Sequence, residues 1–258
     1  MKNEIAKVPS YWACVSGGKD SLYMLYYILH HQNQYPLNGV VHFELEIDYP
    51  FIHDVINEME KECKRFGIPF MRIRPSKTWE ELYNKNGFPS SVARWCNSAY
   101  KLDARRKHTN WLHEHNLTPV WYIGYCVDEV KRYSNRKGAE IYPLVDAGIE
   151  ESAILSWAKH QPIFNHFYET HRRCGCMYCP MASKLEFAYL YKYYPDNFDY
   201  MIEKMKLTEK SLFVKYGRKI SVTSGNPKYN ADYLENIIKT KWIKKLNELE
   251  EQNKNENL

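Results

Sequence analysis

Ser16-Gly-Gly-Lys-Asp-Ser21 is the first of two short segments whose residue types could do chemistry. Neighbouring glycines allow backbone N–H groups to turn inward and approach an anion closely. Lys19 adds a full positive charge, and Asp20 could hold a magnesium ion that bridges phosphate oxygens. The segment therefore predicts a phosphate site made of Ser16, Gly17, Gly18, Lys19, Asp20 and Ser21. The alternative is a Gly-Gly turn followed by a capped helix, since the spacing is not that of a Walker loop.

Cys174-Gly-Cys-Met-Tyr-Cys179 is the second segment, with three thiols within six residues. Gly175 relaxes the backbone, so that these thiols can converge on one metal. A fourth ligand could be Cys96, which lies 78 residues before Cys174. Four thiolates suit zinc and an iron–sulfur cluster equally well. Two alternatives stay open: His166 or His171 as a ligand, and reduced, metal-free cysteines in a packed turn.

Alternating strands and helices are expected to position the phosphate segment. Short apolar runs that end near glycine or a polar turn predict strands, and apolar residues at helical spacing predict helices. The predicted strands are 11–15, 40–43, 69–73 and 120–123. The predicted helices between them are 20–31, 51–66 and 97–116. This rhythm, with few hairpin turns, predicts an α/β fold with a twisted parallel sheet flanked by helices.

The second half of the sequence changes character. An irregular, cysteine-bearing segment follows residue 162, and the pattern after residue 182 is helical. We therefore expect a nucleotide-binding domain at 1–162 and a cysteine-cluster segment with a basic helical region at 163–258. Residues 201–245 contain eleven Lys and Arg against four Asp and Glu, with interleaved aromatic residues, which suits nucleic-acid contact. The alternative is an amphipathic helix with a solvated lysine face.

Composition limits the classes of protein that fit. Of the 258 residues 44% are apolar, which favours a packed core over disorder. The longest apolar run, 22–29, is too short to span a bilayer, and residues 1–10 do not resemble a signal peptide. Seven unevenly spaced cysteines argue against a disulfide framework and predict a reduced, cytoplasmic location. The net charge of +5 is mild and does not by itself indicate nucleic acid.

Four segments together resemble the phosphoadenosine phosphosulfate (PAPS) reductase family, over about residues 10–190. Ser16–Ser21 matches the PP-loop signature of the wider superfamily of adenine nucleotide alpha hydrolases, the N-type ATP pyrophosphatases. The others are Arg94-Trp-Cys-Asn with Lys101, Gly124-Tyr-Cys-Val-Asp-Glu-Val-Lys-Arg132, and Tyr142-Pro-Leu-Val-Asp146. The family often shows a Thr-Gly pair after the second strand, which is absent here.

This resemblance implies a Rossmann-like PP-loop fold and an enzyme that binds ATP and Mg²⁺. Such enzymes adenylate an oxygen of the substrate and release pyrophosphate. The implied catalytic residues are Lys19, Asp20 and Arg132. Gly124 and Asp128 would join the phosphate segment in binding the nucleotide, and Arg94, Lys101 and Arg132 would bind the substrate. A solvated or ion-paired surface role is the alternative for these three cations.

The resemblance also bears on the metal and on the reaction. Cluster-bearing relatives imply ligation by Cys96, Cys174, Cys176 and Cys179, and they favour a 4Fe–4S cluster over zinc. Asn97 breaks the adjacent cysteine pair of these relatives, and Cys174 is an extra cysteine in its place. True reductases carry a nucleophilic cysteine in a C-terminal tail, whereas no cysteine follows Cys179 here.

We therefore favour sulfur transfer, as in the sulfurtransferases of DNA phosphorothioation and tRNA thiolation, with DNA or tRNA as substrate. A cysteine desulfurase would be the sulfur donor, no membrane partner is expected, and the oligomeric state is left open. The alternatives are a PAPS reductase-like oxidoreductase, a nucleotidyl transferase acting on a small molecule with structural zinc, and a non-catalytic nucleotide-binding subunit of a modification or defence complex.

Overall fold

The computed structural model describes residues 7–134, 138–222 and 226–256. The chain divides into two compact units. Unit 1 comprises Met1–Leu45, Tyr49–Ser76 and Lys101–Tyr168, and unit 2 comprises Glu46–Asp48, Lys77–Tyr100 and Glu169–Leu258. The units differ from the expected ranges 1–162 and 163–258 because two earlier segments group with the C-terminal residues.

Unit 1 is built on one parallel sheet with strand order β3-β2-β1-β4-β5. All four strand pairings are parallel, which confirms the predicted sheet. The first four residues of β2 are buried, as expected for a strand covered on both faces. The strands are β1 Val8–Val15, β2 Gly39–Phe43, β3 Phe70–Ile73, β4 Leu117–Tyr122 and β5 Glu140–Ile141.

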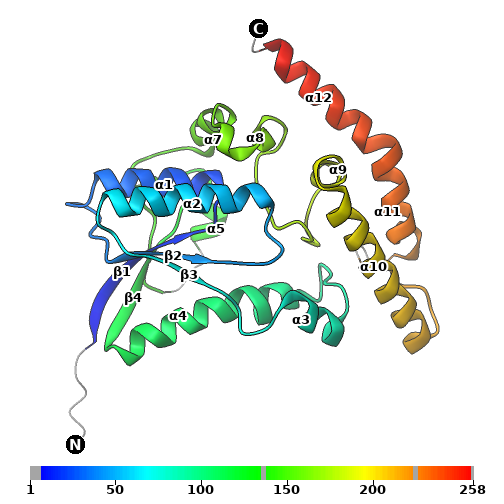
Figure 1. Cartoon of the computed structure of the whole chain (residues 1–258), viewed down its shortest axis with the longest axis horizontal. Helices are drawn as coiled ribbons and strands as arrows, with labels where there is room; N and C mark the ends of the chain where they lie inside the picture. Colours follow the sequence, from blue (N-terminus) through cyan, green and yellow to red (C-terminus); the bar gives the residue numbers. More distant parts are fainter. Residues whose placement is uncertain (1–6, 135–137, 223–225, 257–258) are drawn as a thin grey trace, which may run out of the picture. The chain divides into compact units, whose positions relative to one another are not determined.

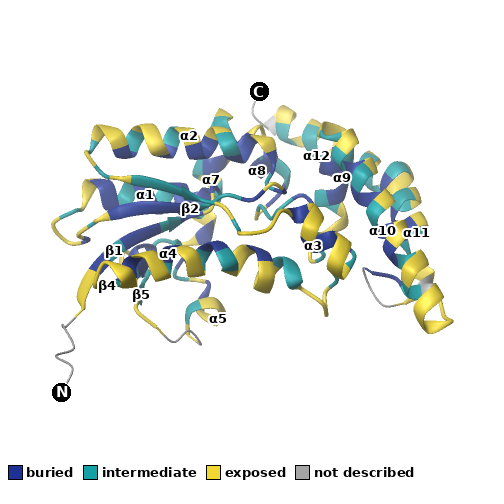
Figure 2. Ribbon diagram, turned by 60° about the horizontal axis from the view of Figure 1, so that its bottom comes forward, coloured by how far each residue is buried: buried dark blue, intermediate teal, exposed yellow. Residues whose placement is uncertain are grey.

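Helices cover both faces of this sheet. Helices α1 (Lys19–His30) and α2 (Pro50–Arg65) lie on one face, and α4 (Leu102–Glu114) lies on the other (Figure 1). Buried leucines at helical spacing, Leu22, Leu25 and Leu29, line one side of α1. Figure 2 shows the strands between the helices, with β2 mostly buried and β3 of intermediate burial. The remaining elements of the N-terminal two thirds are η1 Cys96–Lys101, α5 Val130–Tyr133, α6 Pro143–Asp146, α7 Glu151–Lys159, η2 Pro162–Phe164 and α8 Phe167–Thr170.

The core on the α4 side is aromatic. Trp12 of β1 packs with Val41, Leu112 and Trp121, and all four are buried. The ring of His108, which is fully buried, lies edge-on to Trp12 with 4.4 Å between ring centroids. Neither ring nitrogen of His108 has a hydrogen-bond partner among the described residues. This histidine is therefore a neutral member of the apolar core.

Unit 2 is helical. Helices α9 (Lys184–Tyr193) and α10 (Pro195–Tyr216) pack together, and α9 also contacts the C-terminal helices. Two capping boxes define helix starts: Thr78 with Glu81 before α3, and Ser183 with Glu186 before α9. The other elements of this unit are α3 Trp79–Asn86, η3 Pro227–Tyr229, α11 Ala231–Ile237, η4 Ile238–Trp242 and α12 Ile243–Glu256.

The segment 77–100 belongs to unit 2 through specific contacts with α10. The hydroxyl of Tyr83 donates to the carbonyl oxygen of Lys204 at 3.1 Å. The backbone N–H of Phe88 donates to Oγ1 of Thr208 at 2.8 Å. Contacts across about 120 positions of sequence thus hold this segment to α10.

In the part of the chain that the structure describes, no helix combines the length and the apolar character needed to cross a membrane.

Candidate active site

Two of the predicted motif segments meet at the edge of the sheet where the strands carry their carboxyl ends. The chain runs from β1 outward through β2 to β3, and then returns to β4 on the other side of β1. The strand order therefore reverses between β1 and β4. Open α/β sheets bind their ligands at this crevice. The segment Ser16–Ser21 follows β1, and Gly124 follows β4.

The phosphate segment forms a tight loop that leads into α1. Gly17 has φ +76°, a left-handed conformation that favours glycine, and a Cβ there would lie 2.6 Å from Cγ2 of Ile52. Gly18 is the N-cap of α1 and supplies no side-chain cap. Oγ of Ser21 donates to the carbonyl oxygen of Gly18 at 2.9 Å and accepts from the N–H of Ser16 at 3.2 Å. The side chain of Ser21 thus fixes the loop by bonding to the backbone of Ser16 and Gly18.

Lys19 lies in the interior of unit 1. Its side chain is 1% exposed, and Nζ donates to Oδ1 of Asp20 at 2.7 Å and to Oε1 of Glu151 at 3.3 Å. Burial raises the pKa of Asp20, although the neighbouring Lys19 partly offsets this effect. Glu151, which the sequence did not predict in the site, is equally buried. The cation is therefore shared between two carboxylates.

Tyr168 reaches the phosphate loop from α8. Its hydroxyl accepts the backbone N–H of Lys19 at 3.0 Å, and its ring centroid lies 5.9 Å from Nζ of the same lysine. The side chain is buried. The Tyr168 hydroxyl therefore accepts a hydrogen bond from one of the N–H groups that could otherwise bind an anion.

The segment after β4 packs directly against the start of α1. A Cβ on Gly124 would lie 2.8 Å from the carbonyl oxygen of Asp20, so only glycine allows this approach. Sγ of the buried Cys126 lies 3.7 Å from Oδ1 of Asp20. Burial, followed by the nearby carboxylates, raises the pKa of this thiol, which therefore stays protonated.

Acidic residues in the same segment organise the surroundings of Lys19. Oδ1 of Asp128 accepts the backbone N–H of Glu151 at 3.0 Å, and thereby holds the beginning of α7. The buried carboxylate of Glu129 accepts from the N–H of Cys126 at 3.2 Å and from Nη1 of Arg132 at 2.6 Å. The Arg132 side chain is 45% exposed. Asp128 and Arg132 thus both lie in the segment after β4, and a hydrogen bond joins Asp128 to the backbone of Glu151.

Arg94 and Lys101 are both exposed. Arg94 belongs to unit 2, and Lys101 is the last residue of η1 and the first of the following segment of unit 1. Their predicted role in substrate binding stays a prediction.

The predicted metal ligands lie in unit 2 and are all half-buried and not joined by disulfides. The N–H of Cys179 donates to the carbonyl oxygen of Cys176 at 3.1 Å, which makes a turn. The thiol of Cys174 donates to the carbonyl oxygen of Gly175 at 3.3 Å.

Among the described residues, no group of three or more His, Cys, Asp or Glu side chains is placed so that it could hold a metal ion. The donor chemistry of four reduced thiols suits a soft metal. Ligation by Cys96, Cys174, Cys176 and Cys179 stays a prediction.

Sequence reasoning missed Glu151 and Tyr168 in the site. Glu151 is the first residue of α7, and an acidic residue is common at the start of a helix, so no local pattern distinguished it. Tyr168 contacts Lys19 across 149 positions of sequence. Glu129 was within a quoted motif, but had no role assigned to it.

Comparison with known proteins gives limited matches. No family model matches the chain. An uncharacterized protein of Methanocaldococcus jannaschii is 26% identical over 170 aligned positions, and the match covers 59% of this chain and 38% of that protein. The match thus spans well under half of the relative's length.

A U34-tRNA thiolase of Methanococcus maripaludis, solved with its 4Fe–4S cluster, is similar in structure, with a TM-score of 0.42 and 18% identity. The similarity covers 92% of this chain and 75% of that chain. The resemblance to the PAPS reductase family, which was drawn from motifs, therefore stays a prediction.

Proposed function

We propose that this protein is a cytoplasmic ATP-dependent enzyme of the PP-loop type, which adenylates a substrate and releases pyrophosphate. The further proposal is that activation serves sulfur transfer to a nucleic acid, with DNA or tRNA as acceptor and a cysteine desulfurase as donor. The observation that carries the first proposal is the buried Lys19 at the reversal point of the sheet.

Burial is what gives Lys19 its chemical value. An ammonium group in water interacts weakly with a phosphate, whereas one inside a protein interacts several times more strongly. Lys19 is the first residue of α1, and the N–H groups at the start of this helix favour the charge that would develop on a departing pyrophosphate. The two carboxylates orient the lysine side chain before a nucleotide binds.

Asp20 and Glu151 are the residues that would hold Mg²⁺, which usually binds one or two carboxylates together with phosphate oxygens. Asp20 fits this role because its side chain is 23% exposed, while Glu151 is nearly closed off. The metal would neutralise phosphate charge. The side chain of Arg132 is 45% exposed, whereas that of Lys19 is buried, so we assign Arg132 to contact with the substrate.

The first experiment measures binding of ATP and pyrophosphate, with Mg²⁺, by calorimetry. The test variant is Lys19→Gln/Glu151→Gln, which removes the cation together with one of its buried partners. We expect at least tenfold weaker binding, because a charge-assisted hydrogen bond to phosphate contributes about 1.5–3 kcal/mol. Lys131→Gln, an exposed lysine beside Arg132, is the control and should bind like wild type.

Unchanged affinity in the double variant, or no binding by wild type at millimolar ATP, would overturn the assignment of the phosphate loop. Release of AMP and pyrophosphate on addition of tRNA or DNA then tests the acceptor class.

The cysteine segment 174–179 is tested separately, by analysis of iron, sulfide and zinc in protein purified without oxygen. The proposal is that Cys96, Cys174, Cys176 and Cys179 converge when they bind a 4Fe–4S cluster. Iron with acid-labile sulfide, lost in Cys176→Ser, is the expected result. Zinc alone would favour nucleotidyl transfer to a small molecule, because a structural zinc supplies no sulfur chemistry.

A further inference from the structure

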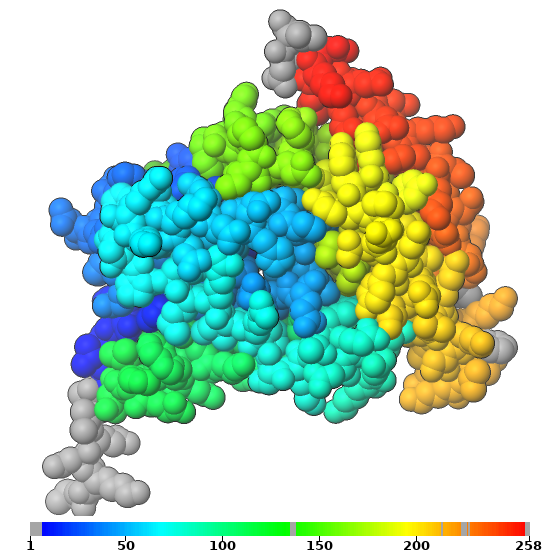
Figure 3. Space-filling model, in the orientation of Figure 1, coloured from blue at the N-terminus to red at the C-terminus, as the bar shows by residue number. Residues whose placement is uncertain are grey.

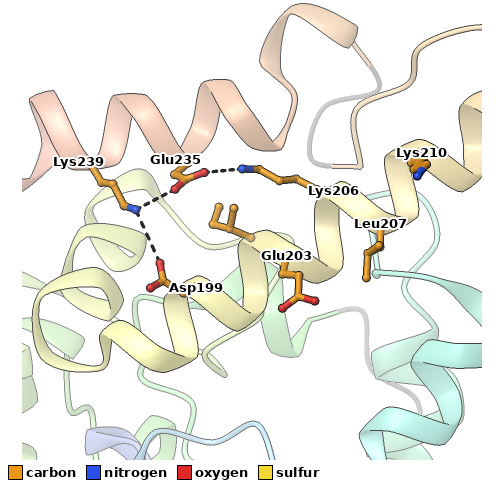
Figure 4. A pocket seen from close by; sticks show the side chains of 8 residues that line it. Asp199, Glu203, Lys206, Leu207, Lys210, Glu235 and Lys239 are labelled. Atoms are coloured by element: carbon orange, nitrogen blue, oxygen red, sulfur yellow. Dashed lines mark hydrogen bonds and ion pairs between the residues drawn. The ribbon is translucent and has the colours of Figure 1, made fainter.

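The basic residues of α10 and the segments after it fall into two groups. The first group is held by carboxylates. Lys206 pairs with Asp232 at 2.9 Å and with Glu235 at 2.7 Å, and Lys239 pairs with Glu235 at 2.8 Å. Figure 4 shows the pairs that Glu235 makes with Lys206 and Lys239, and the contact of Lys239 with Asp199, across a hollow of about 520 Å³ lined by residues of α10, α11 and η4. Two of the lysines that line this hollow, Lys206 and Lys239, are thus paired with carboxylates, and the third, Lys210, also lines the neighbouring hollow.

Lys210 and Lys219 form the second group. They line a neighbouring hollow of about 260 Å³, together with Asn230. Both lysines are exposed, and neither makes an ion pair within the described part of the chain. In Figure 4, Lys210 stands further along α10 than the paired lysines. Two ammonium groups that make no ion pair among the described residues therefore line one small hollow.

The acidic residues of this hollow are engaged in other contacts. The carboxylate of Glu209 accepts the backbone N–H groups of Val222 and Ala231, each at 3.1 Å. Asp232 pairs with Lys206. The hollow is thus lined by three lysines and two carboxylates, which leaves a net charge of +1. Since both carboxylates have other partners, Lys210 and Lys219 remain available to a ligand.

Further cations and exposed aromatic rings continue the surface along the chain. Lys215 and Arg218 are exposed, and no ion pair engages them among the described residues. Tyr216 is 53% and Tyr229 40% exposed, which is unusual for side chains of their size. Figure 3 shows the end of α10, in yellow-orange, at the surface. Cations interleaved with exposed rings are typical of surfaces that bind single-stranded nucleic acid.

We propose that the Lys210–Lys219 hollow binds a backbone phosphate of a nucleic acid, and that Tyr216 and Tyr229 stack on its bases. The inference rests on the proposed function only for the idea that this nucleic acid is the sulfur acceptor. A phosphodiester suits the hollow because it carries one negative charge and accepts several hydrogen bonds. An acidic protein segment would match the lysines but would not use the two rings.

The test is fluorescence anisotropy with single strands of RNA and of DNA, each about 20 nucleotides long, over a range of salt concentrations. Lys210→Gln/Lys219→Gln removes the two proposed phosphate contacts. The slope of log Kd against log salt should fall by about 1.4, at about 0.7 per contact in a single strand, and Kd should rise about tenfold at low salt. Lys241→Gln/Lys244→Gln is the matched control, since both lysines are exposed, lie outside the hollow and change the net charge equally.

Tyr216→Ala tests the stacking contribution by itself. Kd should rise about fivefold while the salt slope is unchanged, because stacking releases no counterions. Tighter binding of RNA than of DNA would show that the protein contacts the 2′-hydroxyl. Equal binding would show that it recognises the phosphodiester backbone and bases, which both strands share.

Three results would overturn the inference. These are a double variant that behaves like its control, a wild-type salt slope of zero, and equal competition by poly-glutamate, which would assign the hollow to an acidic protein. ATP binding is measured on the same samples. If wild type binds no ATP, the proposed function is overturned, but the proposed nucleic-acid surface is not.

Discussion

The burial of Lys19 changes what its removal would do. An exposed lysine can be replaced with little effect on folding, whereas this one neutralises Asp20 and Glu151 in the interior of unit 1. The same side chain thus supports both stability and the proposed binding of phosphate. Any activity measured on a single Lys19 variant would combine the two effects.

We expect Lys19→Ala to lower the free energy of unfolding by about 3 kcal/mol, because removal of one partner leaves buried carboxylates without a cation. Lys19→Ala/Glu151→Gln should recover a large part of this loss, while both variants bind pyrophosphate at least tenfold more weakly than wild type. Urea unfolding at pH 7 measures the first quantity and calorimetry the second. Equal stability of Lys19→Ala and wild type would show that the carboxylates do not depend on the lysine.

Tyr168 gives a prediction of opposite sign for binding. Its hydroxyl accepts the N–H of Lys19, so an anion that takes this N–H competes with it. In Tyr168→Phe we expect the ligand-free protein to lose about 1 kcal/mol of stability, as for one neutral hydrogen bond. Pyrophosphate should bind about fivefold more tightly, because the competing contact has gone.

The outcome distinguishes three roles of this hydroxyl. Weaker binding of pyrophosphate would show that the hydroxyl donates its proton to the anion. Lower stability with unchanged affinity would mean that it only caps α1. Thermal unfolding with and without pyrophosphate separates these results.

At the scale of elements, the contact between the segment after β4 and the start of α1 decides how the loop is held. Gly124→Ala would place a Cβ 2.8 Å from a backbone oxygen of α1, which cannot rotate away. We expect a loss of about 1–3 kcal/mol in stability, as in other overpacked sites, together with weaker binding of pyrophosphate, since Lys19 and Asp20 move with the helix start.

Gly39→Ala is the matched control. A Cβ there would lie 2.4 Å from the ring of Trp12 in the sheet core, away from the loop. It should lower stability without changing the affinity for pyrophosphate. If both variants lower the affinity equally, the effect is one of general destabilisation and not of the α1 contact.

The sequence predicted four strands and the phosphate loop because their signals are local: apolar runs, a Gly-Gly pair and a helix start. It missed β5, which has two residues, and it predicted one helix over 97–116 where a π-helical turn, η1, precedes α4. A strand of two residues has no periodicity to detect. The π-helical turn leaves an apolar spacing that resembles that of an ordinary helix.

The site itself was less accessible to sequence reasoning. Glu151 and Tyr168 join Lys19 only through the packing of α7 and α8, which no local pattern records. The cysteine motif was visible as spacing, but spacing does not fix where the sulfur atoms lie. Burial of Lys19 was also unexpected, because lysine is the residue least often found inside a protein unless it is paired.

At the scale of the whole molecule, two buried histidines make stability depend on pH. Burial lowers the pKa of His42 and of His108 to about 4, from about 6.5 in an unfolded chain. As pH falls from 6.5 to 4, the unfolded state takes up protons that the folded state does not. Stability is therefore lost over this range, at about 3 kcal/mol for each histidine.

His108→Phe tests this prediction. At pH 7 the variant should be about 1 kcal/mol more stable, since two ring nitrogens without partners among the described residues are removed. Its advantage over wild type should grow by about 2–3 kcal/mol at pH 4.5, measured by urea unfolding. A constant difference between the two pH values would contradict the assignment of His108 as a group that is neutral when folded.

The division of the chain has a consequence for its synthesis on the ribosome. Trp79, Tyr83 and Phe88 are buried in unit 2, but α10, which covers this segment, is translated more than a hundred residues later. The nascent chain therefore carries an exposed aromatic segment during much of its elongation. Such a segment is a natural binding site for a chaperone. Fragments that stop before α10 should accordingly be held by chaperones or aggregate, while the residues of the parallel sheet are already complete.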